Sequence, residues 1–183
     1  LVAEVVIRLT LRLARHYGIP NVTGTEFRRV TLPPERRGIL GQGSVLVQTS
    51  LANRTSPVLR GKWVMEVLIG SPPPPPPPNV PTLEEQGEAK DGVMLTTRQR
   101  MEVHRANPTC NACHRMMDPI GLALDSFDVT AKWRERENGM PLDTSGDFYD
   151  GTKVNSLTEL VDAMLKRRTP LVFLQNISGF MVG

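Results

Sequence analysis

The sequence predicts a mostly α fold with long ordered loops and little β structure. Three observations support it. Apolar residues recur at helical spacing over residues 1–17, 57–69 and 157–167. Two capping-box sequences, Thr96–Gln99 and Ser156–Glu159, each begin a helical segment. The 16 prolines indicate a loop-rich chain between the helices.

In the first third of the chain we expect one helix and two short extended segments. The helix covers residues 1–17 and ends at Gly18. Residues 21–56 are rich in loop-forming residues, and the extended segments are expected at Arg29–Leu32 and Val45–Thr49.

A second helix is expected over residues 57–69, because Pro57 suits a first helical position and Gly70 a position just past a last turn. Residues 72–78 are seven consecutive prolines, which favour a polyproline II rod at about 3.1 Å per residue. Two interpretations stay open. The rod is a ligand for a proline-recognition domain, or it is a stiff spacer lying across the domain surface, where Trp63 is available to pack against it.

Three further helices are expected in the second half of the chain. The first starts at Thr96–Gln99 and runs to about Ala106, where Asn107-Pro108 breaks it. The others are expected at Pro119–Phe127 and Leu157–Arg167.

Both cysteines of the chain lie in one motif, Cys110-Asn-Ala-Cys113-His114. The spacing is that of covalent c-type haem attachment: the two thiols add to the haem vinyl groups, and the next histidine is held under the iron as an axial ligand. With only two Cys and three His in 183 residues, chance is a poor explanation. The sequence therefore predicts a cytochrome-c-like domain with one covalent haem c, held by Cys110 and Cys113, and His114 as the proximal iron ligand.

Three other interpretations of the cysteine pair are open. A zinc site needs four ligands, and His104 and His114 with the two thiolates would supply them, although no second Cys pair is present. A thioredoxin-like redox pair would follow a strand, whereas a polar helix is expected here. A disulfide across so short a loop would add little stability and would not explain the histidine.

The second axial ligand stays open in the sequence. His104 precedes Cys110 by six positions, and the proline-broken turn between them can fold it over the ring, so it is the first candidate for the distal iron ligand. Met140 follows Gly139 and precedes Pro141, which is the setting of the distal Met in many small cytochromes c. The remaining alternatives are a partner chain, an open site, or one of Met117, Met164 and Met181.

Residues around the haem motif suggest its surroundings. We expect the Nδ1–H of His114 to be donated to a backbone carbonyl near Pro119. Arg134 and Lys132 are candidates to pair with the haem propionates, or are solvated cations. Candidates for the apolar wall around the porphyrin, or for ordinary core, are Leu122, Leu124, Phe127 and Trp133.

Taken together, these pieces resemble a known group of proteins. The segments that carry the resemblance, in order, are Arg12–Pro20, Arg36–Leu40, Thr55–Pro57, Arg60–Val64, Pro72–Pro81, His104–His114, Met117–Gly121, Phe127-Asp128 and Trp133-Arg134. The chain thus resembles the large multidomain cytochrome-like proteins of planctomycetes and acidobacteria, which are built from tandem domains of unknown function. The resemblance implies a haem-binding domain at 31–142 between the tail of a preceding helical domain (1–30) and the truncated start of a following one (143–183).

Charge and hydropathy limit the classes of partner and the compartment. The net charge of +3 comes from scattered basic residues, so nucleic-acid binding is not expected. No run of 18 apolar residues predicts a membrane span. The first eight residues include Glu4 and Arg8 and do not read as a signal peptide, and the missing initiator Met suggests a processed chain or a fragment. Because covalent haem attachment takes place outside the energy-conserving membrane, we expect a periplasmic or extracytoplasmic protein.

The expected function is one-electron transfer to and from redox partner proteins, within a larger extracytoplasmic protein or complex. An electron carrier is favoured over a catalyst because no G-x-S-x-G, H-E-x-x-H or G-x-G-x-x-G motif accompanies the haem motif. Two alternatives stay open: a haem-containing oxidoreductase or peroxidase subunit with an open iron site, and a structural module whose haem staples a loop-rich fold.

Overall fold

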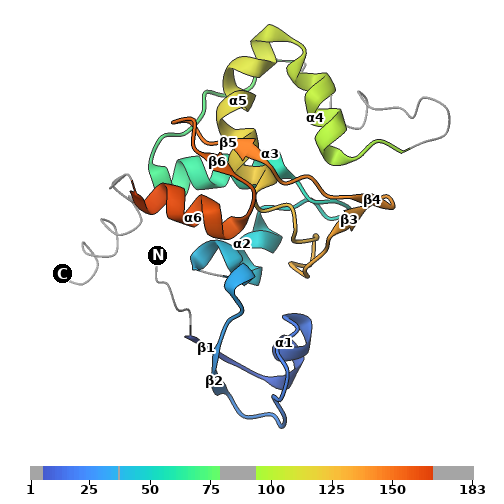
Figure 1. The fold of residues 1–183 in the computed structure, drawn as a ribbon, viewed down its shortest axis with the longest axis vertical. Helices are drawn as coiled ribbons and strands as arrows, with labels where there is room; N and C mark the ends of the chain where they lie inside the picture. Colours follow the sequence, from blue (N-terminus) through green and yellow to red (C-terminus); the bar gives the residue numbers. More distant parts are fainter. Residues whose placement is uncertain (1–5, 37, 79–93, 167–183) are drawn as a thin grey trace.

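The computed structural model describes residues 6–36, 38–78 and 94–166 (Figure 1). Its strands, helices, 3-10 helices (η1, η2) and one π-helix (η3) are, in chain order, β1 (Val6–Leu9), α1 (Leu11–His16), β2 (Arg28–Thr31), η1 (Pro34–Arg36), η2 (Ile39–Gly41), α2 (Gly43–Gln48), α3 (Pro57–Trp63), η3 (Val64–Ile69), α4 (Thr97–Arg105), α5 (Pro108–Leu122), β3 (Arg136–Glu137), β4 (Met140–Pro141), β5 (Gly146–Asp147), β6 (Lys153–Val154) and α6 (Leu157–Lys166).

The described chain is mostly α, as the sequence predicts, and its strands form two-stranded antiparallel ribbons. The helix expected over residues 1–17 is wrong for Val6–Leu9, which form β1 and pair with β2. The helix α1 covers only Leu11–His16. Residues 1–5 lie outside the described residues. The reason is that β-branched residues favour strands, and β2 supplies the backbone partners that a strand needs. β2 confirms the extended segment expected near Arg29–Leu32.

The extended segment expected at Val45–Thr49 is wrong, because these residues belong to α2 and its C-terminal cap. The helix buries Leu46 completely, and the Thr49 hydroxyl donates to the Val45 carbonyl at 2.8 Å. A β-branched residue is tolerated in a helix when a buried contact and a local hydrogen bond of this kind outweigh its strand preference.

The helix expected at 57–69 is confirmed in extent. Pro57 occupies the first position of α3, and the Ser56 hydroxyl accepts a hydrogen bond from the Leu59 amide. The last turns form η3, and Gly70 ends the helix with a left-handed φ of 70°. A residue with a Cβ would be strained in that conformation.

The capping box predicted for α4 is confirmed. The Gln99 amide donates to the Thr96 hydroxyl, and the Thr96 amide donates to the Gln99 side chain at 2.8 Å. α4 ends at Arg105 and α5 begins at Pro108, with Asn107 as its N-cap, so the expected break is also confirmed. At the start of α6, the Glu159 amide donates to the Ser156 hydroxyl, which is one half of the predicted capping box, whereas the Glu159 carboxylate accepts from the Asn155 amide.

The separate helix expected at Pro119–Phe127 is wrong, because α5 runs without interruption to Leu122 and holds Pro119 inside it. Proline removes one backbone hydrogen bond from a helix interior but does not end the helix when packing on both sides holds the chain in place. Here the backbone of Pro119 is pressed against Gly146 of β5, where a Cβ would lie 2.9 Å from the Pro119 Cα.

α3 and α5 touch through their backbones at two glycines. A Cβ added to Gly61 of α3 would lie 2.0 Å from the Met117 carbonyl oxygen, and one added to Gly121 of α5 would lie 1.7 Å from the Pro57 carbonyl oxygen. Only glycine allows so close an approach. The two contacts therefore set the position of α5 relative to α3.

A buried arginine fastens the segment that follows α5. Arg60 of α3 donates to the carbonyl oxygens of Leu124 and Phe127, each at 2.8 Å, and to that of Asp128 at 3.1 Å. The Asp125 carboxylate lies 3.9 Å from the same guanidinium. Burial lowers the pKa of Arg60 to about 10, so it stays charged at neutral pH.

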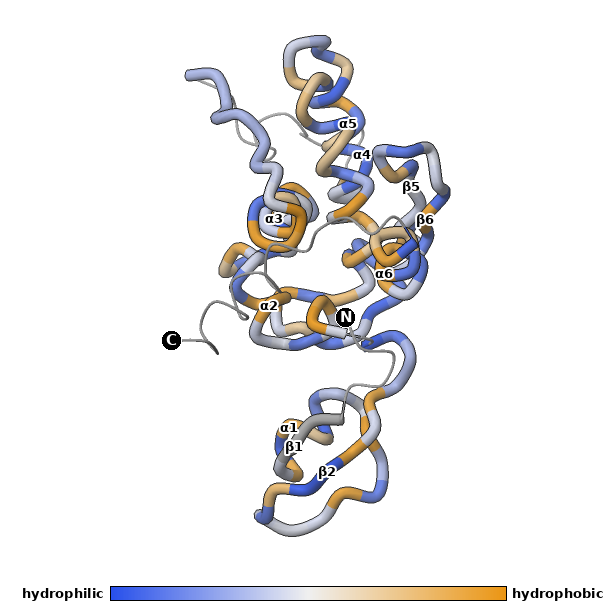
Figure 2. Tube along the Cα trace, turned by 90° about the vertical axis from the view of Figure 1, so that its left-hand side faces the viewer, coloured by the Kyte–Doolittle hydropathy of each residue, from blue (hydrophilic) through white to orange (hydrophobic). Residues whose placement is uncertain are grey.

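The core lies where α3, η3, α5 and α6 meet, and Figure 2 shows apolar residues concentrated there. α6 contributes Leu160, Val161 and Met164 to the same core that contains Leu124 and Phe127. The division of the chain at residues 31 and 143 stays a prediction.

Among the helices described, none combines the length and hydropathy needed to cross a membrane.

We predict that Gly121→Ala destabilises the fold by about 2–3 kcal/mol or more, although alanine is the better helix former, because its methyl group would overlap the Pro57 carbonyl. Urea unfolding followed by circular dichroism measures the change. Arg115→Ala, on the exposed face of the same helix, serves as the control and should stay within about 0.5 kcal/mol of the parent chain.

We also predict that Arg60→Met costs about 3–5 kcal/mol of unfolding free energy, since it leaves the Leu124 and Phe127 carbonyls without their shared donor in the core and removes one of the cations that face Asp125. The control is Lys132→Met, which also replaces a cation by methionine but at an exposed position. It should change the free energy of unfolding little. Equal thermal midpoints for the two variants would contradict this account of Arg60.

Candidate functional site

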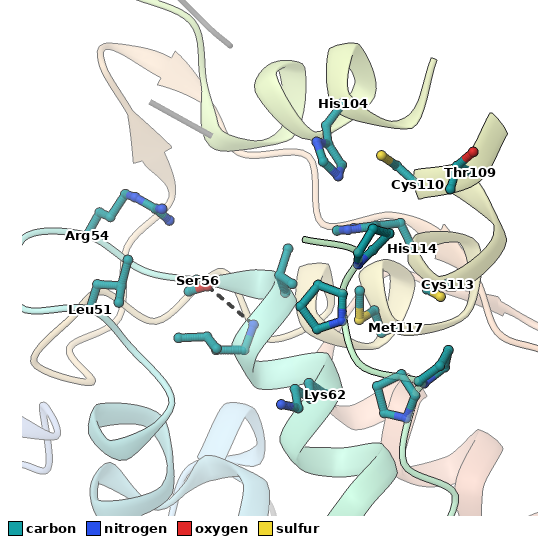
Figure 3. Close-up of a pocket in the computed structure, with 16 residues that line it drawn as sticks. Leu51, Arg54, Ser56, Lys62, His104, Thr109, Cys110, Cys113, His114 and Met117 are labelled. Atoms are coloured by element: carbon teal, nitrogen blue, oxygen red, sulfur yellow. Dashed lines mark hydrogen bonds between the residues drawn. The ribbon is translucent and has the colours of Figure 1, made fainter. Parts of the chain in front are cut away.

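A pocket of about 470 Å³ opens between α3, the proline segment and the α4–α5 pair (Figure 3). This volume is in the range of pockets that hold small molecules and cofactors. The residues that line it are Leu51, Arg54, Ser56, Val58, Leu59, Lys62, Pro73, Pro74, Pro76, Pro77, His104, Thr109, Cys110, Cys113, His114 and Met117. All three haem-motif residues are therefore at this one pocket.

The two cysteines lie at the N-terminal end of α5. Asn107 caps the helix by accepting from the Thr109 amide at 2.9 Å, and Pro108 occupies its first position. Cys110 and Cys113 are half-buried free thiols, and their spacing of three positions places them on one face of the helix. Both thiols are available for covalent chemistry at the pocket.

His114 is oriented by a carboxylate. Its Nδ1 donates to Oδ1 of Asp118 at 2.9 Å, one helical turn further along α5. Our prediction that a backbone carbonyl near Pro119 accepts this hydrogen is wrong. α5 continues through this stretch, and its carbonyls point along the helix axis. The i, i+4 spacing of His114 and Asp118 was the signal in the sequence that identifies the real partner.

With its Nδ1 hydrogen donated to Asp118, His114 carries its free lone pair on Nε2. This is the state in which a histidine binds a metal, and the carboxylate also fixes the plane of the ring.

His104 comes to the same place from the other helix. It lies in the last turn of α4, is 7 % exposed, and points toward His114 (Figure 3). The ring centroids are 4.6 Å apart, and the rings meet edge to face. Burial lowers the pKa of His104, and the nearby His114 lowers it further against the opposing effect of Asp118, so His104 is neutral at pH 7.

The helix that carries His104 is anchored at its other end. The backbone amide and the hydroxyl of Thr97 both donate to Glu137 of β3, at 2.9 and 2.6 Å. Arg98 donates to the Ser145 carbonyl at 2.7 Å and forms an ion pair with Asp143. These contacts hold α4 beside α5.

The methionines considered as ligands are distributed differently. Met117 is buried and lines the pocket. Met140 is 49 % exposed on β4, and Met164 is buried in the core, so neither lines the pocket. Met181 lies outside the described residues.

The apolar wall of the pocket is not formed by the residues that we expected there. Leu122, Leu124 and Phe127 are buried in the protein interior, and Trp133 stacks edge to face on Phe127 away from the pocket. The wall consists instead of Leu51, Val58, Leu59, Met117 and four of the seven prolines. The proline run was visible in the sequence as a segment that can lie across the surface, whereas no periodicity connects Leu51, Val58 and Leu59 with it.

Arg134 and Lys132, the cations expected to pair with the haem propionates, do not line the pocket. Arg134 donates to the Asp125 carboxylate at 2.8 Å and to the Thr55 hydroxyl at 3.0 Å, inside the polar network below α3. Lys132 does not line the pocket. Arg54 and Lys62 do, at its edge.

The proline segment contributes one side of the pocket. Pro73, Pro74, Pro76 and Pro77 line it, whereas Trp63 packs against the hydrophobic core. Within the described ranges, no three side chains of the His, Cys, Asp and Glu types are grouped so as to hold a metal ion. The site is thus a set of two thiols and two imidazoles on an apolar pocket.

A family model matches the part of the chain that contains the pocket. The family model described as "PSCyt3: Protein of unknown function (DUF1588)" matches residues 36–137, more than half of the chain, and this range includes the pocket and the Cys110–His114 motif. Searches of curated proteins and of solved structures found no match. The domain is one found in planctomycete-type cytochrome-like proteins. The chain therefore belongs to the PSCyt3 (DUF1588) family.

Proposed function

We propose that this chain is a c-type cytochrome domain that carries one covalently attached haem c and transfers single electrons within a larger extracytoplasmic protein or complex. One observation carries the proposal: Cys110, Cys113, His114 and His104 line a single pocket. Haem supplies one-electron redox chemistry when bound, and the chain supplies attachment, axial ligands and an apolar environment.

The donor set fits this group. Two free thiols on one helix face match two vinyl groups, and His114 immediately after them holds its Nε2 lone pair ready for iron. The largely apolar walls suit a porphyrin, whose faces are apolar. Arg54 and Lys62 at the pocket edge suit its two propionates.

We assign His104 as the distal ligand. It is buried, neutral at pH 7 and aimed at His114 from the opposite helix. The two ring centroids are 4.6 Å apart, so the His104 ring would have to move aside when haem is bound. Two histidine ligands leave iron no open position, which favours an electron carrier over a peroxidase-like enzyme.

The compartment and partners follow from the same proposal. Thioether attachment to haem takes place outside the energy-conserving membrane, so the protein is periplasmic or extracytoplasmic, and its electrons come from redox partner proteins. Membership of a family found in cytochrome-like proteins supports a place within a larger multidomain protein.

We predict that the full chain, exported in a host with a c-type maturation system, keeps haem bound after denaturation. Intact-mass spectrometry and the pyridine haemochrome spectrum measure this. Cys110→Ala/Cys113→Ala should lose all covalent haem, since both thioethers are removed. Wild-type protein that contains stoichiometric zinc and shows no haem absorbance would overturn the proposal.

We further predict that each of two substitutions removes the low-spin haem spectrum. His104→Ala should give a high-spin haem that binds CO, and His114→Ala should also lose the low-spin spectrum. Visible and EPR spectra measure the change. His16→Ala is the matched control, because His16 donates to the Thr130 carbonyl at 2.6 Å and does not line the pocket. Rapid binding of CO or cyanide to the wild-type protein would instead indicate an open iron site.

A further inference from the structure

A carboxylate lies directly behind the proposed iron ligand. The Asp118 side chain is fully buried, and its Oδ1 accepts the Nδ1 hydrogen of His114 at 2.9 Å. The i, i+4 spacing therefore places a full negative charge against the imidazole from within the same helix.

The surroundings leave this charge weakly compensated. Oδ2 of Asp118 accepts no hydrogen bond from the described residues. The cation that faces it is Arg105 of α4, with Nε at 3.7 Å. Because the carboxylate is away from solvent, its field acts on His114 with little screening.

A carboxylate partner makes a metal-bound imidazole more electron-donating than a carbonyl partner does. The added negative charge favours ferric over ferrous iron, since the ferric state carries one more positive charge.

From these contacts we infer that Asp118 is a positioning residue that fixes the His114 ring and lowers the reduction potential of the haem, a role that rests on the proposed function. When one electron enters from a redox partner protein, ferric iron becomes ferrous while the Asp118 charge stays in place, so reduction is disfavoured. The site is then a low-potential carrier, whose electron donors are strong one-electron reductants.

The test compares reduction potentials of the full haem-loaded chain at one pH. Asp118→Asn removes the charge and keeps the size of the side chain, and we expect it to favour reduction about tenfold, which is about 59 mV for one electron. The control, Glu102→Gln, removes one negative charge from α4 at an exposed side chain that pairs with Arg98 and should shift the potential much less.

A second readout needs no variant. In the reduced low-spin protein, NMR should show the His114 Nδ1 proton far downfield and protected from exchange, as expected for a hydrogen bond to a buried carboxylate. This measurement tests whether Asp118 holds the His114 ring in the haem-loaded chain, and it can overturn the inference even if Asp118→Asn does not fold.

The outcomes separate the inference from the function on which it rests. Equal shifts for Asp118→Asn and Glu102→Gln, or a His114 proton that exchanges freely, overturn the role of Asp118 and leave the cytochrome proposal standing. A lower thermal midpoint with no change in potential indicates a merely structural residue and also overturns it. Absence of covalent haem in the wild-type chain overturns both.

Discussion

The backbone contact between α3 and α5 positions both walls of the pocket. Gly61 and Gly121 let the two helices approach until a single methyl group would overlap a carbonyl oxygen. α5 carries both thiols and His114, and α3 carries Val58, Leu59 and Lys62 of the opposite wall. Because close-packed backbones cannot adjust as side chains can, the crossing fixes how these two sets of residues face each other.

Two buried charged side chains link the helices that the contact between α3 and α5 positions. Arg60 reaches from α3 to three carbonyl groups beyond the end of α5, and Asp118 reaches from α5 to Arg105 on α4. Each of these groups would be costly to bury alone, so each is tied to partners that cannot move without exposing it. The polar network and the glycine contact thus stabilise one arrangement of α3, α4 and α5 around the pocket.

Local signals in the sequence were reliable where a few neighbouring residues decide the backbone. The capping box at Thr96, the break at Asn107-Pro108 and the stop at Gly70 all occur as predicted. The wrong predictions of secondary structure occur where contacts with a distant segment determine the backbone conformation. Pairing with β2 draws Val6–Leu9 into a strand, and packing against β5 keeps Pro119 within a helix.

The proximity of Cys110, Cys113 and His114 follows from the sequence alone, since their spacing is a property of one helical segment. Even the Asp118 partner is readable there, because one helical turn separates it from His114. The contact between His104 and His114, and the pocket wall of Leu51, Leu59 and the prolines, come from the packing of distant segments. These residues come from separate parts of the chain, and their proximity follows from how closely the helices pack, which no local pattern encodes.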